Sequence, residues 1–398
     1  MKIIIIGNSI GAFSALKEIR KHDKNSEITI LSRERYNYYS PILLPYYISG
    51  RLSEEQLFPK HINLFIQKNA KLLLNENVLN INTKEKIVKT EKHLFKYDTL
   101  IIASGASPRK LKIPGAEETY VLRTFEDAKK IKNIIGNEII IIGAGPVGIE
   151  TALSLVEQKK KIKIIEMMDS ILSTIFSKNI SYYIEDQLKN LGIEIYKSEK
   201  VIEISKTRKD YLVKTEGKKF KGNAVIMAVG VTPNTNFLDE NIKVGRYNGI
   251  IVDEFMRTNV PDVYAAGDCI ELKNLIEDNT SLIPVWPNAF ETGKIAGANV
   301  AGKVERYNGG IRINSINILN KVYFSVGNVW QGDKKIEIQN NEILEVYNIK
   351  NNKIIGVEII GDVKWAGVIK RFLTTKKEIK MPFKGVEDIK EIIIPQKL

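Results

Sequence analysis

Short apolar runs alternate with longer segments of helical periodicity along the first three quarters of the chain. The run Ile3–Ile6 is followed by a glycine, by a helical pattern over about Gly11–Lys21, and by a second apolar run at Glu27–Ser32. A wholly apolar, β-branched run of this length is typical of a strand that is buried on both faces. The pattern therefore predicts a strand, a glycine turn, a helix and a second strand.

The same succession of elements occurs again later in the chain. The pentapeptide Ile-Ile-Ile-Ile-Gly stands at Ile3–Gly7 and again at Ile139–Gly143. The second copy leads into a helical pattern over about Pro146–Gln158 and then into the strand Lys161–Glu166. Two such repeats predict an α/β protein with two Rossmann-like dinucleotide-binding units, each built on a mostly parallel sheet with right-handed crossovers.

Each repeat has its own closing strand. Tyr97–Arg109 and Gly222–Asn234 are both apolar runs that end in Ala-x-Gly, with a proline three residues after the glycine. From about Gly309 the chain has no glycine fingerprint, and we expect a separate α+β domain there. Its predicted elements are the strands Val322–Val326, Glu342–Ile349 and Lys353–Ile360 and a helix near Ala366–Thr374. We expect three domains: residues 1–109 with 233–308, residues 110–232, and residues 309–398.

The composition is that of a soluble globular protein, with 43% of 398 residues hydrophobic and 27% charged. No apolar run approaches the roughly 18 residues that span a bilayer, so we expect no integral membrane segment. The N-terminal apolar stretch is too short for a signal peptide. The single cysteine, Cys269, precludes an intramolecular disulfide and fits the reducing cytoplasm. All three histidines, His22, His61 and His93, lie in the first quarter, so we expect no metal site.

The formal net charge is +13 and most basic residues are lysine. The lysines are scattered, without an arginine-rich run or a basic patch interleaved with aromatic residues, and we therefore expect no nucleic-acid partner. An acidic protein partner and an acidic membrane surface remain open as explanations of the charge.

The second glycine turn carries a complete fingerprint. Gly143, Gly145 and Gly148 have the G-x-G-x-x-G spacing, which lets a backbone approach a pyrophosphate at a helix N-terminus. Glu166 ends the next predicted strand, where a carboxylate hydrogen-bonds the ribose 2′-hydroxyl of NAD and repels a 2′-phosphate. The two methionines that follow supply no arginine for such a phosphate. We therefore expect NADH to be preferred over NADPH.

The first turn is a degenerate form of the same pattern. Gly7 is kept, but Ser9 and Ala12 stand where the second and third glycines would be. The turn gains weight from Gly267–Asp268, because a predicted strand delivers this carboxylate at a glycine, where a second cofactor needs a partner for its hydroxyl groups.

These motifs together resemble the FAD-dependent pyridine nucleotide–disulfide oxidoreductases. More narrowly, they resemble the branch that contains NADH:rubredoxin reductases, NADH oxidases and coenzyme A disulfide reductases. In chain order the motifs are GNSIGA, YYSPILLPYYISG, YDTLIIASGASPR, GAGPVGIE, AVGVTPN, VYAAGDC and WPNAFETGKIAGANVAG.

The resemblance implies a site for each of two cofactors. The implied FAD residues are Gly7, Ser9, Gly11, Ala12, Arg33, Glu34, Ser40, Ala103, Ser104, Gly105, Arg109, Gly267, Asp268, Trp286 and Ala289. The implied NAD residues are Gly143, Gly145, Pro146, Val147, Gly148, Glu150, Glu166 and Gly230, with Glu150 near the nicotinamide.

Several of these residues have an expected role. The first turn holds the FAD pyrophosphate, Arg33 or Glu34 meets the adenosine ribose, and Asp268 binds the ribitol. The family's acid after the second strand is replaced by Ser32. Trp286 lies beside the isoalloxazine, although a core position remains open for it. The helix that begins near Asn288 directs its positive end at the flavin.

Two departures from the family pattern decide the expected chemistry. Ile42 stands where the disulfide-reducing and water-forming members carry a redox cysteine, and no histidine follows His93 to form the catalytic pair of the C-terminal domain. Without a thiolate at this position, disulfide reduction is excluded. Pro146 replaces the tyrosine that gates the nicotinamide pocket in some members, and Tyr46 or Tyr47 could supply another gate.

Three functions therefore remain open. The first is an NADH:acceptor oxidoreductase whose acceptor is a small acidic iron–sulfur carrier, rubredoxin or ferredoxin, or dioxygen. The second is a peripheral NADH:quinone reductase with the tail Gly385–Leu398 as a short amphipathic anchor. The third is an electron-transfer subunit of a larger complex, or a chain that no longer holds FAD. The oligomeric state, with a homodimer among the alternatives, is also left open.

Overall fold

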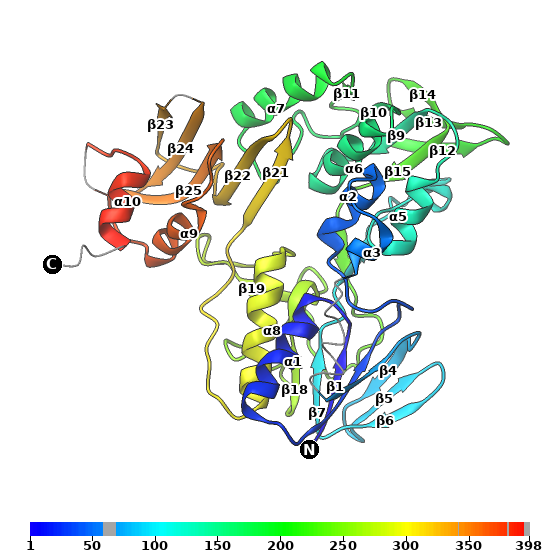
Figure 1. The fold of residues 1–398 in the computed structure, drawn as a ribbon, viewed down its shortest axis with the longest axis vertical. Helices are drawn as coiled ribbons and strands as arrows, with labels where there is room; N and C mark the ends of the chain where they lie inside the picture. The colour runs from blue at the N-terminus through cyan, green and yellow to red at the C-terminus, as the bar shows by residue number, and fades with distance from the viewer. Residues whose placement is uncertain (59–68, 341, 380–381, 394–398) are drawn as a thin grey trace. The chain divides into compact units, whose positions relative to one another are not determined.

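A computed structural model describes residues 1–58, 69–340, 342–379 and 382–393 of the protein (Figure 1). The chain divides into two compact units, each assembled from two stretches of sequence. Unit 1 consists of Met1–Pro108 and Val231–Gly310, and unit 2 of Arg109–Gly230 and Ile311–Leu398. The grouping of residues 311–398 with unit 2 differs from the three-domain division, which stays a prediction.

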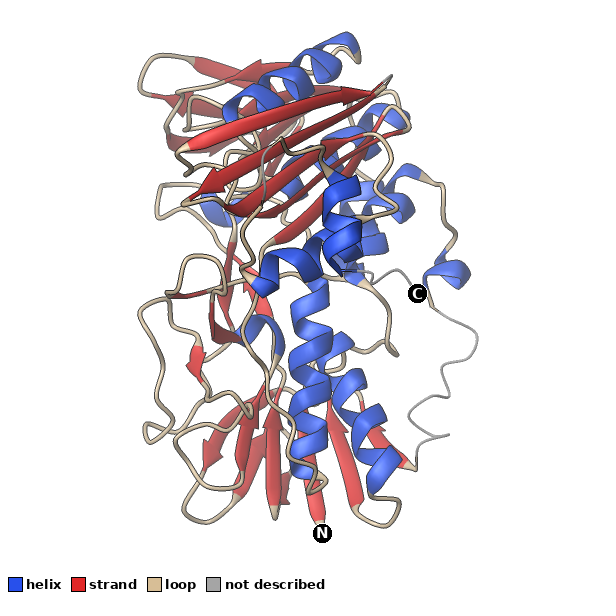
Figure 2. Ribbon diagram, turned by 90° about the vertical axis from the view of Figure 1, so that its left-hand side faces the viewer, coloured by secondary structure: helices blue, strands red, loops and turns tan. Residues whose placement is uncertain are grey.

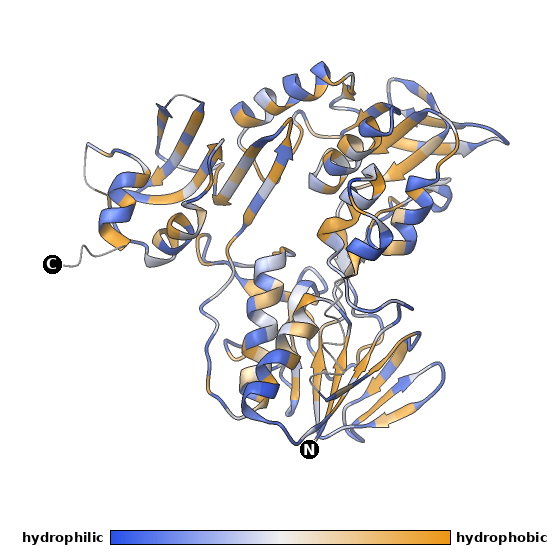
Figure 3. Ribbon diagram, in the orientation of Figure 1, coloured by the Kyte–Doolittle hydropathy of each residue, from blue (hydrophilic) through white to orange (hydrophobic). Residues whose placement is uncertain are grey.

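Unit 1 is built on a five-stranded sheet in which all neighbours run parallel. Its strands, in spatial order, are β18 (Val263–Ala265), β7 (Thr99–Ile102), β1 (Lys2–Ile6), β2 (Glu27–Leu31) and β3 (Ala70–Leu73). The four isoleucines of β1 are all buried, which confirms the prediction of a strand covered on both faces. The strands are accordingly apolar along their length (Figure 3).

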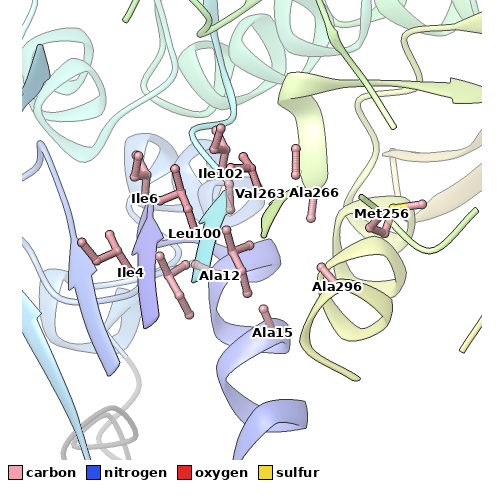
Figure 4. Packing of buried hydrophobic residues seen from close by; sticks show 14 of the residues in the cluster. Ile4, Ile6, Ala12, Ala15, Leu100, Ile102, Met256, Val263, Ala266 and Ala296 are labelled. Carbon is pink, nitrogen blue, oxygen red and sulfur yellow. The ribbon is translucent and has the colours of Figure 1, made fainter. Parts of the chain in front are cut away.

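Two helices, α1 (Ile10–His22) and α8 (Trp286–Val300), lie side by side against this sheet (Figure 2). A Cβ atom added at Gly293 would lie 2.2 Å from the carbonyl oxygen of Gly11, and one at Gly297 would lie 2.4 Å from that of Ala15. Small side chains fill the rest of the contact, among them Ala12, Ala15 and Ala296 (Figure 4). The two helix backbones can approach this closely only because these side chains are absent or small.

The remaining elements of unit 1 are short. One antiparallel sheet consists of β4 (Val78–Asn82), β5 (Ile87–Thr90) and β6 (Leu94–Lys96), and another sheet of β17 (Ile250–Ile251), β19 (Ile270–Lys273) and β20 (Thr280–Ser281). Strands β8 (Ala106–Pro108) and β16 (Val231–Pro233) pair antiparallel. The short helices are η1 (Pro41–Leu43), α2 (Leu44–Ser49), α3 (Glu54–Leu57) and η3 (Gly267–Cys269).

The first part of unit 2 repeats the parallel design. Its sheet has the order β11 (Glu194–Tyr196), β10 (Lys161–Ile165), β9 (Glu138–Ile142) and β15 (Ala224–Met227). The accompanying helices are η2 (Ala116–Glu118), α5 (Phe125–Lys132), α6 (Pro146–Glu157) and α7 (Lys178–Asn190). A three-stranded antiparallel sheet of β12 (Val201–Lys206), β13 (Tyr211–Thr215) and β14 (Lys219–Gly222) completes it. The predicted α/β fold with two parallel sheets is confirmed.

The C-terminal part of unit 2 is an antiparallel sheet with two helices. In spatial order its strands are β21 (Ile313–Ile318), β22 (Lys321–Gly327), β25 (Lys353–Ile360), β24 (Ile343–Lys350) and β23 (Lys334–Asn340). Helix α9 (Ala366–Thr375) is the predicted one, and α10 (Val386–Ile393) lies within the tail Gly385–Leu398 that was considered as a short amphipathic anchor. The backbone N–H of Ser177 donates to the Glu358 carboxylate, 2.7 Å away, and so ties the start of α7 to this sheet.

The helix contact yields a stability prediction. Replacement of Gly293 by alanine should lower the free energy of unfolding by at least about 2 kcal/mol, because the methyl group meets the backbone of α1 in a packed interior. Gly367→Ala in α9 is the matched control, since a Cβ there meets nothing within 4 Å. The control should be neutral or raise stability by up to about 1 kcal/mol. Urea unfolding followed by circular dichroism compares the two, and equal effects would contradict the packing argument.

Candidate functional site

The first glycine turn joins the end of β1 to the start of α1. Gly7 has φ +115°, and a Cβ atom there would lie 2.1 Å from the carbonyl oxygen of Ala103. Ser9, in an extended conformation, precedes the first helical residue. Any side chain at Gly7 would therefore separate the ends of β1 and β7, which explains why this glycine is kept although the second and third are replaced.

Residues from four distant segments converge at Gly11. A Cβ atom added at Gly11 would lie 3.5 Å from the Ala289 carbonyl oxygen, 3.8 Å from the Ala103 Cβ and 3.9 Å from the Gly267 Cα. All four were predicted at the FAD from separate motifs. The structure brings them together, but Gly11 itself serves helix packing, because the backbone of Gly293 lies against it.

Asn234 holds the turn that follows β7. Its backbone N–H and its side-chain amide donate to the carbonyl oxygens of Gly105 and Ser104, at 3.0 and 2.8 Å. In return its Oδ1 accepts from the hydroxyl of Ser107 at 2.6 Å. Sequence reasoning missed Asn234 as a site residue, although it is the last residue of the second Ala-x-Gly segment.

The residues after β2 reach the same turn. Both terminal guanidinium nitrogens of Arg33 lie 3.4–3.5 Å from the Ser107 hydroxyl oxygen. The Glu34 carboxylate accepts a hydrogen bond of 2.7 Å from the Tyr39 hydroxyl, and Ser32 is buried. Arg33 is thereby placed beside the turn held by Asn234.

Five buried side-chain oxygens of unit 1 have no partner within the part of the chain that the structure describes: those of Asn8, Ser40, Glu76, Tyr97 and Ser281. Two of them, Asn8 and Ser40, lie in segments whose motifs predict the FAD site. An orphaned buried acceptor is costly, and a bound group is one way to satisfy it. Together with the bare backbone at Gly7, the unpartnered side-chain oxygen of Asn8 fits a polar cofactor at this turn. Asn8 was not predicted, because it occupies a variable position of the fingerprint.

The sole thiol lies inside unit 1. Cys269 is fully buried in η3, and its Sγ lies 3.2 and 3.4 Å from the carbonyl oxygens of Ala266 and Ile102. Burial raises the pKa of this thiol. The neighbouring Asp268 is partly buried in the same turn. Cys269 therefore has the environment of a structural side chain and not of a reactive thiolate.

Two other predicted positions are exposed. Ile42, in η1, is 57% exposed. Trp286 is 39% exposed and stacks on Phe290, with the ring centroids 5.6 Å apart and the planes at 8°. Trp286 is therefore not a core aromatic residue.

The second glycine turn, in unit 2, has two glycines at close backbone contacts. A Cβ at Gly143 would lie 2.4 Å from the Ala228 carbonyl oxygen, and one at Gly148 would lie 2.1 Å from that of Gly143. Gly145 precedes α6 and has nothing within 4 Å of its Cβ position. Pro146 is the first residue of α6, and Val147 beside it is 43% exposed. The open Gly145 and the helix N-terminus form the arrangement that binds a pyrophosphate.

Glu166 follows β10, and its side chain contacts the second glycine turn. Its carboxylate accepts from the backbone N–H groups of Ala144 and Met168, at 2.7 and 2.8 Å. Two hydrogen bonds fix its position beside the fingerprint. Gly230, with φ +96°, has open space around it, and its carbonyl oxygen accepts from the Arg109 N–H at 2.9 Å. Arg109, predicted at the FAD, is the first residue of unit 2, so the structure does not group it with the other residues predicted there.

Comparison with known proteins identifies the family. Residues 1–293 match the sequence profile of the family described as pyridine nucleotide-disulphide oxidoreductase. The chain belongs to this family.

Two relatives and one solved structure show the breadth of this similarity. The NADH oxidase of Methanocaldococcus jannaschii is 27% identical over 91% of this chain and 88% of its own length. The epsilon subunit of the NADH-dependent phenylglyoxylate dehydrogenase of Aromatoleum evansii is 29% identical, over 82% and 79%. The NADH:rubredoxin oxidoreductase structure from Clostridium acetobutylicum matches with a TM-score of 0.77 and 27% identity, over 98% of each chain.

As a pyridine nucleotide-disulphide oxidoreductase, the protein is an FAD- and NAD(P)H-dependent enzyme. The resemblance inferred from the motifs is thereby confirmed. Within the described residues, no helix has the length and apolar character needed to cross a membrane. The individual FAD and NAD contacts remain predictions.

One carboxyl group of this enzyme stands out for its surroundings. Glu150 lies in the first turns of α6, two residues after the last fingerprint glycine. Desolvation raises its pKa from 4.5 to about 7. The described residues offer its carboxylate no hydrogen bond or ion pair, so nothing offsets the cost of the charge. Its predicted place near the nicotinamide remains a prediction.

The raised pKa of Glu150 predicts how the stability of the protein changes with pH. The folded protein holds the Glu150 proton more tightly than the unfolded chain, so ionisation should reduce stability as the pH rises from about 4.5 to about 7. The loss should be at most about 3 kcal/mol. Glu150→Gln should remove this component from the pH profile of urea unfolding, whereas the exposed control Glu117→Gln should retain it. Superimposable profiles for all three proteins would show that Glu150 is not desolvated.

Proposed function

We propose that the protein oxidises NADH and passes the electrons, through FAD bound in unit 1, to a small acidic iron–sulfur carrier protein, without a redox-active cysteine. The observation that carries the proposal is that the chain has no thiol in a position to react with the flavin or a substrate. The residue at the family's cysteine position is the exposed Ile42, and the only thiol is the buried Cys269. An aliphatic side chain cannot attack a disulfide or form a sulfenic acid.

The residues of unit 1 have separable tasks toward FAD. The bare backbone at Gly7 and the N-terminus of α1 accommodate the pyrophosphate, with Asn8 and Ser40 as polar partners. Asp268 binds the ribitol, and Arg33 meets the adenosine end. FAD supplies, when bound, the acceptance of a hydride and the release of single electrons. The side chains of the protein need only orient the rings and exclude water, so no acid or base is required for the hydride step.

The second turn supports a preference for NADH. A hydrogen bond of 2.7 Å from the Ala144 N–H holds the Glu166 carboxylate at the edge of the fingerprint. A ribose 2′-hydroxyl can donate to such a carboxylate, whereas a 2′-phosphate is repelled. The following Met167, 61% exposed, offers no positive charge to a phosphate.

The acceptor is inferred from charge and from the relatives. A net charge of +13 attracts an acidic carrier over long range and raises the rate of encounter. The similar structure from Clostridium acetobutylicum is named for rubredoxin. Dioxygen is a further acceptor to be measured, since the relative from Methanocaldococcus jannaschii is named an NADH oxidase.

A second candidate function is that of an electron-transfer subunit. It is favoured by the relative from Aromatoleum evansii, which is one subunit of a dehydrogenase. The quinone reductase hypothesis has less support, because Ile389 of α10 is fully buried and the Lys390 ammonium lies over the Trp365 ring at 4.1 Å. Part of the apolar face of this helix is therefore buried in the protein and cannot insert into a membrane. The last five residues of the predicted anchor lie outside the described residues.

A redox titration tests the cysteine-free mechanism. The purified protein should be yellow, with about one noncovalent FAD per chain, and should take up two electrons per FAD from NADH. No thiolate–flavin charge-transfer band should appear, and any long-wavelength band formed with NADH should vanish when dithionite is the reductant. Uptake of four electrons would contradict the proposal.

Alkylation provides the control for this titration. Iodoacetamide should modify Cys269 only after unfolding, because the thiol is buried, and NADH-to-dye activity should survive treatment of the folded protein. Loss of activity on modification of the folded protein would assign Cys269 a role in electron transfer. Rates with rubredoxin, ferredoxin, a quinone analogue and dioxygen, measured side by side, identify the acceptor.

The preference for NADH rests on one carboxylate and can be tested there. Glu166→Gln should narrow the difference in kcat/KM between NADH and NADPH by about 1–3 kcal/mol, because a charged discrimination is lost. Glu138→Gln, at the opposite end of the same sheet, is the matched control and should leave the ratio unchanged. Equal use of both nucleotides by the unmodified protein would show that Glu166 is not at the ribose.

A further inference from the structure

The hydroxyl group of Thr292 joins two parts of unit 1 that the sequence separates by about twenty residues. Thr292 lies in the second turn of α8 and is fully buried. Its Oγ1 accepts a hydrogen bond of 3.0 Å from the backbone N–H of Gly267 and donates one of 2.7 Å to the carbonyl oxygen of Asn288. The same hydroxyl also lies 3.3 Å from the Ala289 carbonyl oxygen. One side chain therefore connects the Gly267–Asp268 turn to the first turn of α8.

The first turn of α8 has a second anchor on its other side. Asn288 is 2% exposed, and its Oδ1 accepts from the Tyr307 hydroxyl at 3.2 Å. Its side-chain amide donates to the Ile283 carbonyl oxygen at 3.3 Å. The backbone N–H of Tyr307 is itself bonded to the Glu254 carbonyl oxygen at 2.7 Å. The hydroxyl of Thr292 therefore bonds the Gly267–Asp268 turn to a helix turn that Asn288 anchors.

A second threonine shows that this connection is not a general property of helical threonines. Thr151 in α6 is also fully buried, and its hydroxyl donates to the Val147 carbonyl oxygen one turn earlier, at 2.6 Å. Thr151 therefore resembles Thr292 in donating its hydroxyl to a carbonyl oxygen one turn earlier in its own helix. Only Thr292 also accepts a backbone N–H from a neighbouring turn, among the hydrogen bonds described for the two side chains.

We propose that Thr292 is a positioning residue for the flavin. It sets the distance between the Asp268 carboxylate, which holds the ribitol, and the N-terminus of α8, which faces the isoalloxazine. The inference rests on the proposed function of unit 1 as the FAD site. The positive end of α8 favours the anionic reduced flavin, and this effect falls off within one turn of the helix end. A small displacement of Asp268 from α8 therefore changes both FAD affinity and reduction potential.

The experiment compares three variants with the wild-type protein. Thr292→Val keeps the shape of the side chain but leaves the Gly267 N–H and the Asn288 carbonyl without the hydroxyl. Thr292→Ser restores the hydroxyl, and Thr151→Val removes an equally buried hydroxyl from α6. The measurements are the dissociation constant of FAD from the apoprotein, by flavin fluorescence, the midpoint potential of the bound flavin, and thermal unfolding.

Thr292→Val should weaken FAD binding at least about fivefold, as expected when a partly buried backbone donor loses its partner, and should lower the midpoint potential. Thr292→Ser should return both values to within about twofold of wild type. Thr151→Val should lower thermal stability without changing either value. If Thr292→Val does not fold, Thr292→Ala takes its place in the experiment. The alanine variant lacks the same hydroxyl, and the expected changes in FAD affinity and potential are the same.

Two results would overturn the inference. One is a Thr292→Val protein that loses stability but keeps wild-type FAD affinity and potential, which would make the hydroxyl merely structural. The other is a serine variant that folds but behaves like the valine variant. A wild-type protein that is colourless and takes up no FAD would instead overturn the proposed function, and this inference with it.

Discussion

The contact between α1 and α8 is the constraint on which unit 1 depends. The two helices meet along Gly11, Ala15, Gly293 and Gly297, and a methyl group added at Gly293 or Gly297 would overlap the carbonyl oxygen of Gly11 or Ala15 on the facing helix. Because the backbones lie so close, the first turn of α8 is brought to the end of β1 and to the Gly7 turn. The segments that carry the predicted FAD residues can converge only at this separation. Packing without side chains thus sets the geometry in which the polar residues act.

In both glycine turns the backbone passes close to a carbonyl oxygen of the neighbouring segment, but the later residues of the two turns differ. Both Gly7 and Gly143 have positive φ and face a carbonyl oxygen of the neighbouring strand's continuation, so neither tolerates a side chain. The third position differs, because Gly148 lies against the carbonyl of Gly143 whereas its counterpart is Ala12. In the first turn the close backbone approach lies between Gly11 and Gly293 of α8. A degenerate fingerprint is therefore compatible with a preserved turn.

The strongest predictions from sequence were those that depended on local patterns. The buried isoleucine strands and the helices after both turns begin and end within one or two residues of the predicted positions, because periodicity and glycine are local signals. Helix α10 falls in the tail that the sequence marked only as a candidate amphipathic anchor, whereas its Ile389 is buried in the protein. Asn234 and Thr292 could not be found from sequence. Their roles come from hydrogen bonds to segments far along the chain, and no spacing rule encodes such pairs.

The antiparallel pairing of β8 with β16 has a consequence for the history and engineering of the fold. Pro108 and Val231 are partners in this ladder, so the chain leaves unit 1 and returns to it at adjacent points. When two ends are held this close, an inserted segment of any length adds little closure entropy to the host. Such junctions are where insertion and excision of whole domains are best tolerated. The 109–230 segment can accordingly be regarded as an insertion between two paired strands of unit 1, and a replacement module would also have to provide a partner for residues 311–398, which belong with it in unit 2.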